Sequence, residues 1–319
     1  YLTDPVHELR LSRYAPRHLA MLWGAVAHKV KALHLETCTR RNDDDMDALT
    51  EALRQQQQLE VLHMDTDLGS PSRTITEISY EHFADACSNL PCLKEMEINF
   101  RRIIIPNHCL LYWVTACAAM PTLVSLRLEH LPWDMDYTEF FRACQASSSL
   151  KALVLFQTTQ FSITSEDDGS VIMDIPKQQN WNALATMIQY NSSLQELTVG
   201  LDYNQYFSLQ TIATALRHNQ HLRTLRIEFR SGPPFVSAAQ AEDWDAFLNV
   251  VREHNVTLGS LDIVQGGGNF FSTNRNQKLQ KKSEELFFLI ALNRSFRRHR
   301  LLGRAAEDAS LQELSLIHI

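Results

Sequence analysis

The stretch LVSLRL at residues 123–128 and the stretch LKALVL at residues 150–155 both have the form Leu-x-x-Leu-x-Leu. Close variants of this motif recur along the chain and begin at Val6, Val30, Leu59, Leu93, Leu123, Leu150, Leu194, Leu222 and Leu258. Five of the eight steps between copies are 24 to 30 residues long, and longer steps are explained by inserted loops. A constant step of this size predicts a stack of similar units. The alternation inside each motif predicts a short strand.

A second apolar pattern precedes the strands with the spacing of a helix face. Large residues stand ten positions before a motif, and smaller ones stand seven and six positions before it. Spacings of three and four residues place side chains on one face of a helix. The large residues are Leu49, Phe83, Trp113, Phe140, Leu184, Ile212 and Leu248. Each unit is therefore predicted to be a strand, a loop and a helix that runs back, so that stacked units form one parallel sheet with helices on one side.

The motif, the step of about 28 residues and the full helix resemble the ribonuclease-inhibitor-type leucine-rich repeat, from Val6 to about Ile263. The resemblance implies an α/β solenoid shaped like a horseshoe, with the parallel sheet on its concave face and helices on its convex face. One feature departs from the family. Its usual Asn three positions after the last strand Leu is missing, and Thr66–Asp67 or Phe100–Arg101 stand near that place.

Asparagine recurs three positions before the motif, at Asn191, Asn219 and Asn255. We expect it to cap the C-terminus of each helix in the left-handed conformation, which Asn tolerates. Three Asn-x-Ser/Thr sequons begin at Asn191, Asn255 and Asn293. Because two of them occupy this cap position, glycosylation is the weaker interpretation.

We predict three regions: a leucine-rich-repeat domain of about nine units at 1–283, a C-terminal capping helix with a basic patch at 284–310, and a doubtful terminal segment at 311–319. The sequence LSLIHI at 314–319 is hypothesised to be an artefact of a truncated transcript. The chain starts at Tyr1 inside what looks like a repeat, so we expect it to be a fragment whose targeting signals are missing.

Inserted loops are predicted at 156–180, 229–243 and 264–283, each after a strand and hence at one rim of the solenoid. They either shape a binding site or have no role. The basic patch either favours the C-terminus of its helix or binds an acidic partner or nucleic acid. Its residues are Arg294, Arg297, Arg298, His299, Arg300 and Arg304.

The composition favours an intracellular protein that binds neither membranes nor nucleic acid. The formal charge is −7 and the pI is about 6.0. Such a balance argues against a nucleic-acid or anionic-membrane binder, and no run of 18 apolar residues predicts a membrane-spanning helix. The six cysteines form no CxxC pair, and Cys87, Cys117 and Cys144 face the predicted core. This usage suits a reducing, cytoplasmic environment.

The sequence contains no motif typical of catalysis, and we expect neither a catalytic residue, a cofactor nor a metal. No phosphate loop, dinucleotide-binding turn or nucleophile elbow is present. His34 and His63 share one strand position in adjacent repeats, so they are expected about 5 Å apart on the concave face. They could bind a metal or sense pH, but ordinary partner-facing surface is the preferred interpretation.

We therefore predict a non-enzymatic interaction module or scaffold, expected to be monomeric. It would bind a protein partner on its concave face and on the strand-to-helix rim. The predicted contact residues are His34, Glu36, His63, Asp65, Glu97, Arg127, Glu129, Val154, Phe156, Arg226 and Glu228. An exposed Phe156 beside Arg127 is the expected hot spot, because aromatic residues and Arg dominate interface energetics.

Two alternatives remain open. The first is the leucine-rich-repeat segment of a larger immune receptor or a ubiquitin-ligase substrate receptor. The second is a GTPase-activating protein, since some proteins of this repeat class act in that way. It would need an Arg or Asn presented by a rim loop. Arg40, Arg41, Arg101 and Arg102 could be proposed, but nothing in the sequence selects them.

Overall fold

The protein is an open stack of strand–helix units, seen here in a computed structural model. The structure describes residues 7–12, 30–36, 43–65, 77–100, 107–132, 135–158, 178–201, 209–229, 238–255, 257–265, 268–269 and 277–294. The strands are β1 (Glu8–Ser12), β2 (Ala32–Glu36), β3 (Val61–Asp65), β4 (Glu95–Asn99), β5 (Ser125–Pro132), β6 (Ala152–Thr158), β7 (Glu196–Leu201), β8 (Thr224–Phe229), β9 (Ser260–Gln265) and β10 (Gly268–Asn269). The helices are α2 (Asp43–Arg54), α3 (Glu77–Ser88), α4 (Asn107–Ala118), α5 (Thr138–Ala146), α6 (Gln178–Tyr190), α7 (Leu209–His218), α8 (Ala238–Glu253) and α10 (Gln277–Arg294).

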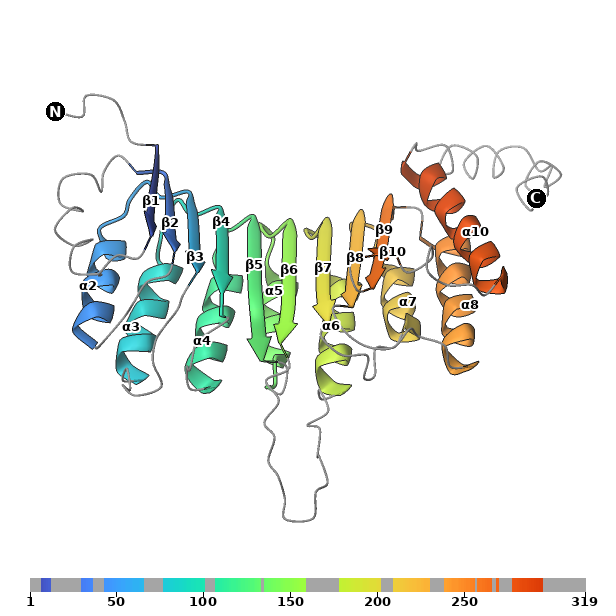
Figure 1. Ribbon diagram of the computed structural model, residues 1–319, viewed down its shortest axis with the longest axis horizontal. Coiled ribbons are helices and arrows are strands. Elements are labelled where there is room, and N and C mark those ends of the chain that lie inside the picture. The colour runs from blue at the N-terminus through green and yellow to red at the C-terminus, as the bar shows by residue number, and fades with distance from the viewer. Residues whose placement is uncertain are drawn as a thin grey trace, which may run out of the picture.

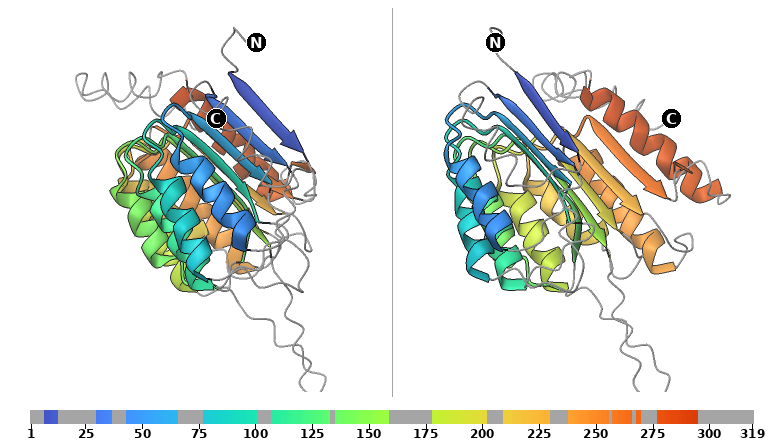
Figure 2. Two further views of the ribbon diagram at one scale, coloured as in Figure 1. Left: turned by 90° about the vertical axis from the view of Figure 1, so that its left-hand side faces the viewer. Right: turned by 60° about the vertical axis from the view of Figure 1, so that its left-hand side comes forward.

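All nine motif copies form strands of one sheet. Strands β1 to β9 are parallel and lie side by side in sequence order, and β10 adds two residues antiparallel to β9. Helices α2 to α8 all cover the same face of the sheet, and none of them lies on the other face (Figures 1 and 2). The predicted fold class, an α/β repeat solenoid, is confirmed. We call the helix-free side of the sheet the concave face.

The alternation within each motif determines which side chains face the helices. In β2, Leu33 and Leu35 are buried, whereas Glu36 is exposed on the opposite side. The apolar faces of the helices fill the other half of the core, where Phe83 and Cys87 of α3 are fully buried. Burying an apolar side chain of this size contributes about 1.5–3 kcal/mol. The repetition of the same contacts in neighbouring units therefore provides the core of the solenoid.

The recurring asparagines form a hydrogen-bonded ladder between repeats. The Asn219 amide nitrogen donates to the carbonyls of Ile188 and Asn191, 2.6 and 3.2 Å away. Its amide oxygen accepts from the backbone N–H groups of His221 and Leu222. Asn191 and Asn255 bond in the same way one repeat earlier and one repeat later. Each Asn thus fixes its own turn and also the end of the helix in the preceding repeat.

The left-handed cap predicted for these asparagines is therefore wrong. Among the non-glycine residues that the structure describes, His130 alone has a positive φ, of 61°. It lies in β5 beside a register shift between Leu128 and Leu131. The asparagines instead provide hydrogen-bond partners for buried carbonyl and N–H groups near each turn.

The helix α10 belongs to the same ladder. Asn293 donates to the carbonyls of Asn255 and Leu258, as Asn255 does to the repeat before it. The helix begins at Gln277 and so crosses residue 283, where the sequence analysis placed the end of the repeats. It is joined to α8 by Arg252, whose Nε donates to Glu285 over 3.0 Å. Arg252 stands six positions before Leu258, where the other helices have apolar residues, and this contact explains the exception.

Several predictions fall on segments outside the described residues. They concern 159–177, 230–237 and 270–276 of the inserted loops, and the whole of 295–319. All three predicted insertions are shortened, because α6, α8 and α10 begin inside them. Within the described residues, no helix combines the length and the apolar character that crossing a membrane requires.

Candidate functional site: the concave face

The concave face displays three rows of side chains, at the second, fourth and sixth positions after each motif start. The strand register aligns the rows, as in the pairs Glu36↔Asp65 and Glu97↔Arg127, except that the register shift after Leu128 interrupts the row of sixth positions between β5 and β6. The rows contain nine carboxylates and only three guanidinium groups. The carboxylates are Glu8, Glu36, Asp65, Glu95, Glu97, Glu129, Glu196, Glu228 and Asp262; the arginines are Arg10, Arg127 and Arg226. The face therefore has a large excess of negative charge.

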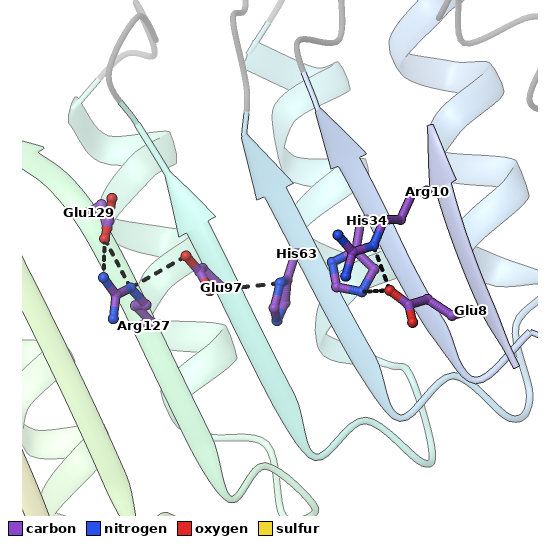
Figure 3. A network of polar contacts seen from close by, with 7 residues as sticks. All are labelled: Glu8, Arg10, His34, His63, Glu97, Arg127 and Glu129. Carbon is purple, nitrogen blue, oxygen red and sulfur yellow. Dashed lines mark hydrogen bonds and ion pairs between the residues drawn. The ribbon is translucent and has the colours of Figure 1, made fainter. Parts of the chain in front are cut away.

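A network of polar contacts crosses the first five strands, and a contact between the rings of His34 and His63 joins its two halves (Figure 3). At its middle, His63 Nδ1 lies 3.7 Å from Glu97, and Glu97 lies 3.3 Å from Arg127 Nε on the next strand. Arg127 Nε also donates to Glu129 over 2.9 Å. These groups come from three neighbouring strands and meet because parallel register places the fourth position of each repeat side by side. The predicted residues His63, Glu97, Arg127 and Glu129 are thus brought together.

The other end of this network of contacts is formed by Glu8, Arg10 and His34. Glu8 accepts from Arg10 Nε and lies 3.3 Å from His34 Nε2. The hydrogen bond from Arg10 and its charge lower the pKa of the Glu8 carboxyl. Glu8 and Arg10 were not among the contact residues predicted from the sequence. Their register opposite Ala32 and His34 was the signal that could have identified them.

The predicted histidine pair is present. The rings of His34 and His63 are edge to face with centroids 4.4 Å apart. Burial is the main cause that lowers the pKa of His34, with further contributions from His63 and Arg10, and these outweigh the opposite effect of Glu8 and Glu36. The Glu8 carboxylate is shared with Arg10, which limits what it offers to His34. Two adjacent imidazoles therefore favour the neutral form of His34.

A hollow of about 240 Å³ lies beside this pair. It is lined by His34, Glu36, His63, Asp65, Glu97 and Asn99, together with backbone neighbours. Glu36 and Asp65 are exposed, and among the described residues neither forms an ion pair. The row of acidic residues Glu36, Asp65 and Glu129 is interrupted by Asn99, which the register places between Asp65 and Glu129. The hollow offers carboxylates to a cationic group.

Phe156 differs from its prediction. It points to the concave face, where Arg127 Cζ lies 5.3 Å from the ring centroid, so the predicted pairing of these two residues is confirmed. Its expected exposure is wrong, because only 6% of the residue is accessible. The ring covers Gly200 on β7, which has no side chain to displace it. Phe156 is therefore a buried support for Arg127 rather than an exposed anchor.

A second group of charges lies beyond this apolar centre. Arg226 Nη2 donates to Glu228 over 3.2 Å, and its Nη1 lies 3.6 Å from Asp262 on β9. Val154 is half-buried and pairs in register with Arg127 and Thr198, so it separates the two charged groups. Asp262 was on the predicted rows but was not selected as a contact. The concave face thus has two charged ends around an apolar centre.

The described residues contain no group of three or more His, Cys, Asp and Glu side chains arranged to hold a metal ion. The rim arginines considered for GTPase activation, Arg40, Arg41, Arg101 and Arg102, lie outside the described residues. So do Cys38 and the basic patch, except Arg294.

No protein-family model matches the chain, and no curated protein matches it. One similar solved structure is titled "Leiomodin-1 Actin-Binding Site 2 (ABS2)". It is 13% identical in sequence, and the match covers 70% of this chain and 94% of that chain with a TM-score of 0.33. This likeness carries no functional argument, so a function has to be inferred from the geometry and charge of the concave face.

Proposed function

We propose that the protein is a non-enzymatic binding module of the ribonuclease-inhibitor-type leucine-rich-repeat class, which recognises a folded protein partner on its concave face. It would act as a cytoplasmic monomer without a cofactor, with repeats over 1–283 and a capping region at 284–310. The adjoining strand-to-helix rim would extend the contact. The partner-facing residues are those predicted from the sequence except Phe156, which acts through Arg127.

The observation that carries this proposal is the excess of carboxylates on one continuous, registered sheet surface. Nine acidic side chains against three arginines attract a surface rich in Lys and Arg and steer its approach. The hollow lined by Glu36 and Asp65 is where we place a cationic anchor of the partner. The apolar centre at Val154 would be covered in the complex.

The ion pairs on this face support recognition more than folding. Exposed pairs contribute little to stability, because solvent screens them and ordering long side chains costs entropy. Their effect here is to hold Glu97, Glu129 and Arg127 in fixed positions before a partner arrives. A pre-organised surface loses less entropy on binding.

Quantitative affinity capture with matched charge reversals tests this function. The bait is compared as wild type, as Glu36→Lys with Asp65→Lys, and as Asp47→Lys with Glu81→Lys. The second pair reverses the same charge on exposed positions of the convex helices α2 and α3. We expect at least one protein that binds the purified wild type directly to be lost with the concave variant and retained by the convex one. Retention of every direct partner by the concave variant would reject the site.

A further inference from the structure

A row of residues at the start of the strands shows one gap. The residue directly after each motif start occupies this row, whose members are linked by backbone hydrogen bonds. In the first repeats, long charged side chains compensate one another: Glu60 lies 3.2 Å from Lys31 and 2.7 Å from Lys94. Towards the C-terminus the row continues through Arg223 to Gly259, which has no side chain. We call this position the rim gap; it lies where the strands begin, at the edge of the sheet opposite the strand-to-helix rim.

The rim gap opens into a pocket of about 430 Å³ that lies between β7, β8, β9 and the end of α10. Figure 1 shows these strands beginning at the same edge of the sheet. Arg223 and Arg294 line the pocket from both sides of Gly259, and His221 adds an imidazole ring. None of the described lining residues is a carboxylate. Arg223 and Arg294 are exposed, and neither forms an ion pair within the described part of the chain.

The remaining lining residues are also suited to an anion. Ser192, Thr224 and Ser260 contribute hydroxyl groups beside the two guanidinium groups. Helix C-termini normally repel anions, because their last carbonyls are unpaired. Here the ladder of asparagines provides hydrogen bonds to carbonyls of this kind, since Asn255 donates to the carbonyls of Leu216 and Asn219. The Gly259 carbonyl accepts from Arg294 Nε, which leaves the other nitrogens of that guanidinium group available to a ligand.

We infer that this pocket binds the phosphate group of a phosphorylated side chain in a peptide segment. A phosphate monoester carries close to two negative charges and three terminal oxygens, so it can accept from two guanidinium groups and several hydroxyls together. A carboxylate, with two oxygens in one plane, is satisfied by a single guanidinium group. The pocket opens at the edge of the sheet, where an extended segment can reach it. The inference does not depend on the concave-face proposal, because different residues carry it.

Fluorescence anisotropy with a rhodamine-labelled pentapeptide tests the inference, using a central phosphoserine between glycines and its unphosphorylated form. We expect saturable binding of the phosphopeptide only. Arg223→Gln and Arg294→Gln should each weaken it at least about ten-fold, as expected for losing a charge-assisted hydrogen bond. Gly259→Gln should do the same by filling the rim gap. A Cβ at Gly259 meets its nearest atom, Arg294 Cα, at 3.5 Å, an ordinary contact, so this variant is compatible with the fold.

The matched control is Arg142→Gln, which removes the same charge from an exposed position of α5. It should leave the affinity for the phosphopeptide unchanged. An equal loss in this control, or the absence of saturable binding, would overturn the inference. Inorganic phosphate serves as a competitor in the same assay. Competition by inorganic phosphate at the same concentration as the unlabelled phosphopeptide would show a site for free phosphate and would overturn the peptide assignment.

Discussion

The ring of Phe156 on β6 occupies the space above Gly200 on β7, where any side chain would overlap it. Gly200 is buried, has no positive φ and stands in the interior of a strand, so its conformation does not require glycine. The absence of its side chain is what allows Phe156 to lie against the sheet. Arg127 lies over the ring, and Arg127 and Phe156 together form the centre of the concave face.

Gly200→Ala is predicted to destabilise the protein by about 1–3 kcal/mol, the usual cost of overpacking. Urea unfolding measures the change. Gly259→Ala is the matched control, because its added Cβ meets ordinary contacts, and it should change stability far less. Combining Gly200→Ala with Phe156→Leu should cost less than the sum of the two single changes. Full additivity would contradict the contact between these residues.

Asn219→Ala is predicted to cost about 3 kcal/mol or more, because it leaves buried carbonyl and N–H groups of two repeats without partners. The comparison is Asn89→Ala, which removes an exposed amide just after α3 that donates to the carbonyl of Asp85. That change should cost less than about 1 kcal/mol. Similar losses of unfolding free energy in the two variants would show that the ladder does not join the repeats.

The same ladder makes a prediction about modification. The amide nitrogens of Asn191, Asn255 and Asn293 are buried and hydrogen-bonded, although each begins a glycosylation sequon. The folded protein is therefore expected to accept no glycan at these sites when incubated with an oligosaccharyltransferase. Glycopeptide mass spectrometry of the folded and the urea-unfolded protein checks this. A glycan attached at any of the three sites before unfolding would contradict it.

His34 should make stability depend on pH around its ordinary pKa. Burial keeps the pKa of His34 below its ordinary value of 6.5 in the folded state, so the unfolded chain takes up this proton first as the pH falls. Its contribution is fully present above pH 6.5 and is lost below it. His34→Gln should therefore reduce the loss of unfolding free energy on acidification, whereas His82→Gln, on an exposed position of α3, should not. Equal pH dependence of His34→Gln and the wild type would contradict the assignment.

The thiols should differ sharply in reactivity. Burial raises the pKa of Cys117 to about 12 and raises that of Cys144 as well. Cys87 and Cys109 are also buried, whereas Cys92 is exposed. Among these five, brief treatment of the folded protein with iodoacetamide is predicted to alkylate Cys92 alone. Peptide mass spectrometry identifies the labelled thiols, and early labelling of Cys117 or Cys144 would contradict the described core.

The motif spacing predicted every strand of the parallel sheet and the buried face of the helices, because periodic apolar residues report burial directly. It also placed His34 opposite His63. The burial of Phe156 could not be predicted, since it depends on Gly200 and Arg127 of two other repeats. For the same reason Asn219 was assigned to its own helix end, although its amide nitrogen bonds to the preceding repeat. Contacts between repeats follow from register, which local patterns do not contain.

Photo-crosslinking tests the central claim most directly, that a protein partner contacts the concave face. A benzoylphenylalanine is placed at Thr198, on the concave face between Val154 and Arg226, or at Thr214, exposed on the convex helix α7. The partner identified by affinity capture is added to each purified protein and irradiated. We expect a crosslinked product from position 198 and none from position 214. Crosslinking from position 214 but not from position 198 would contradict it.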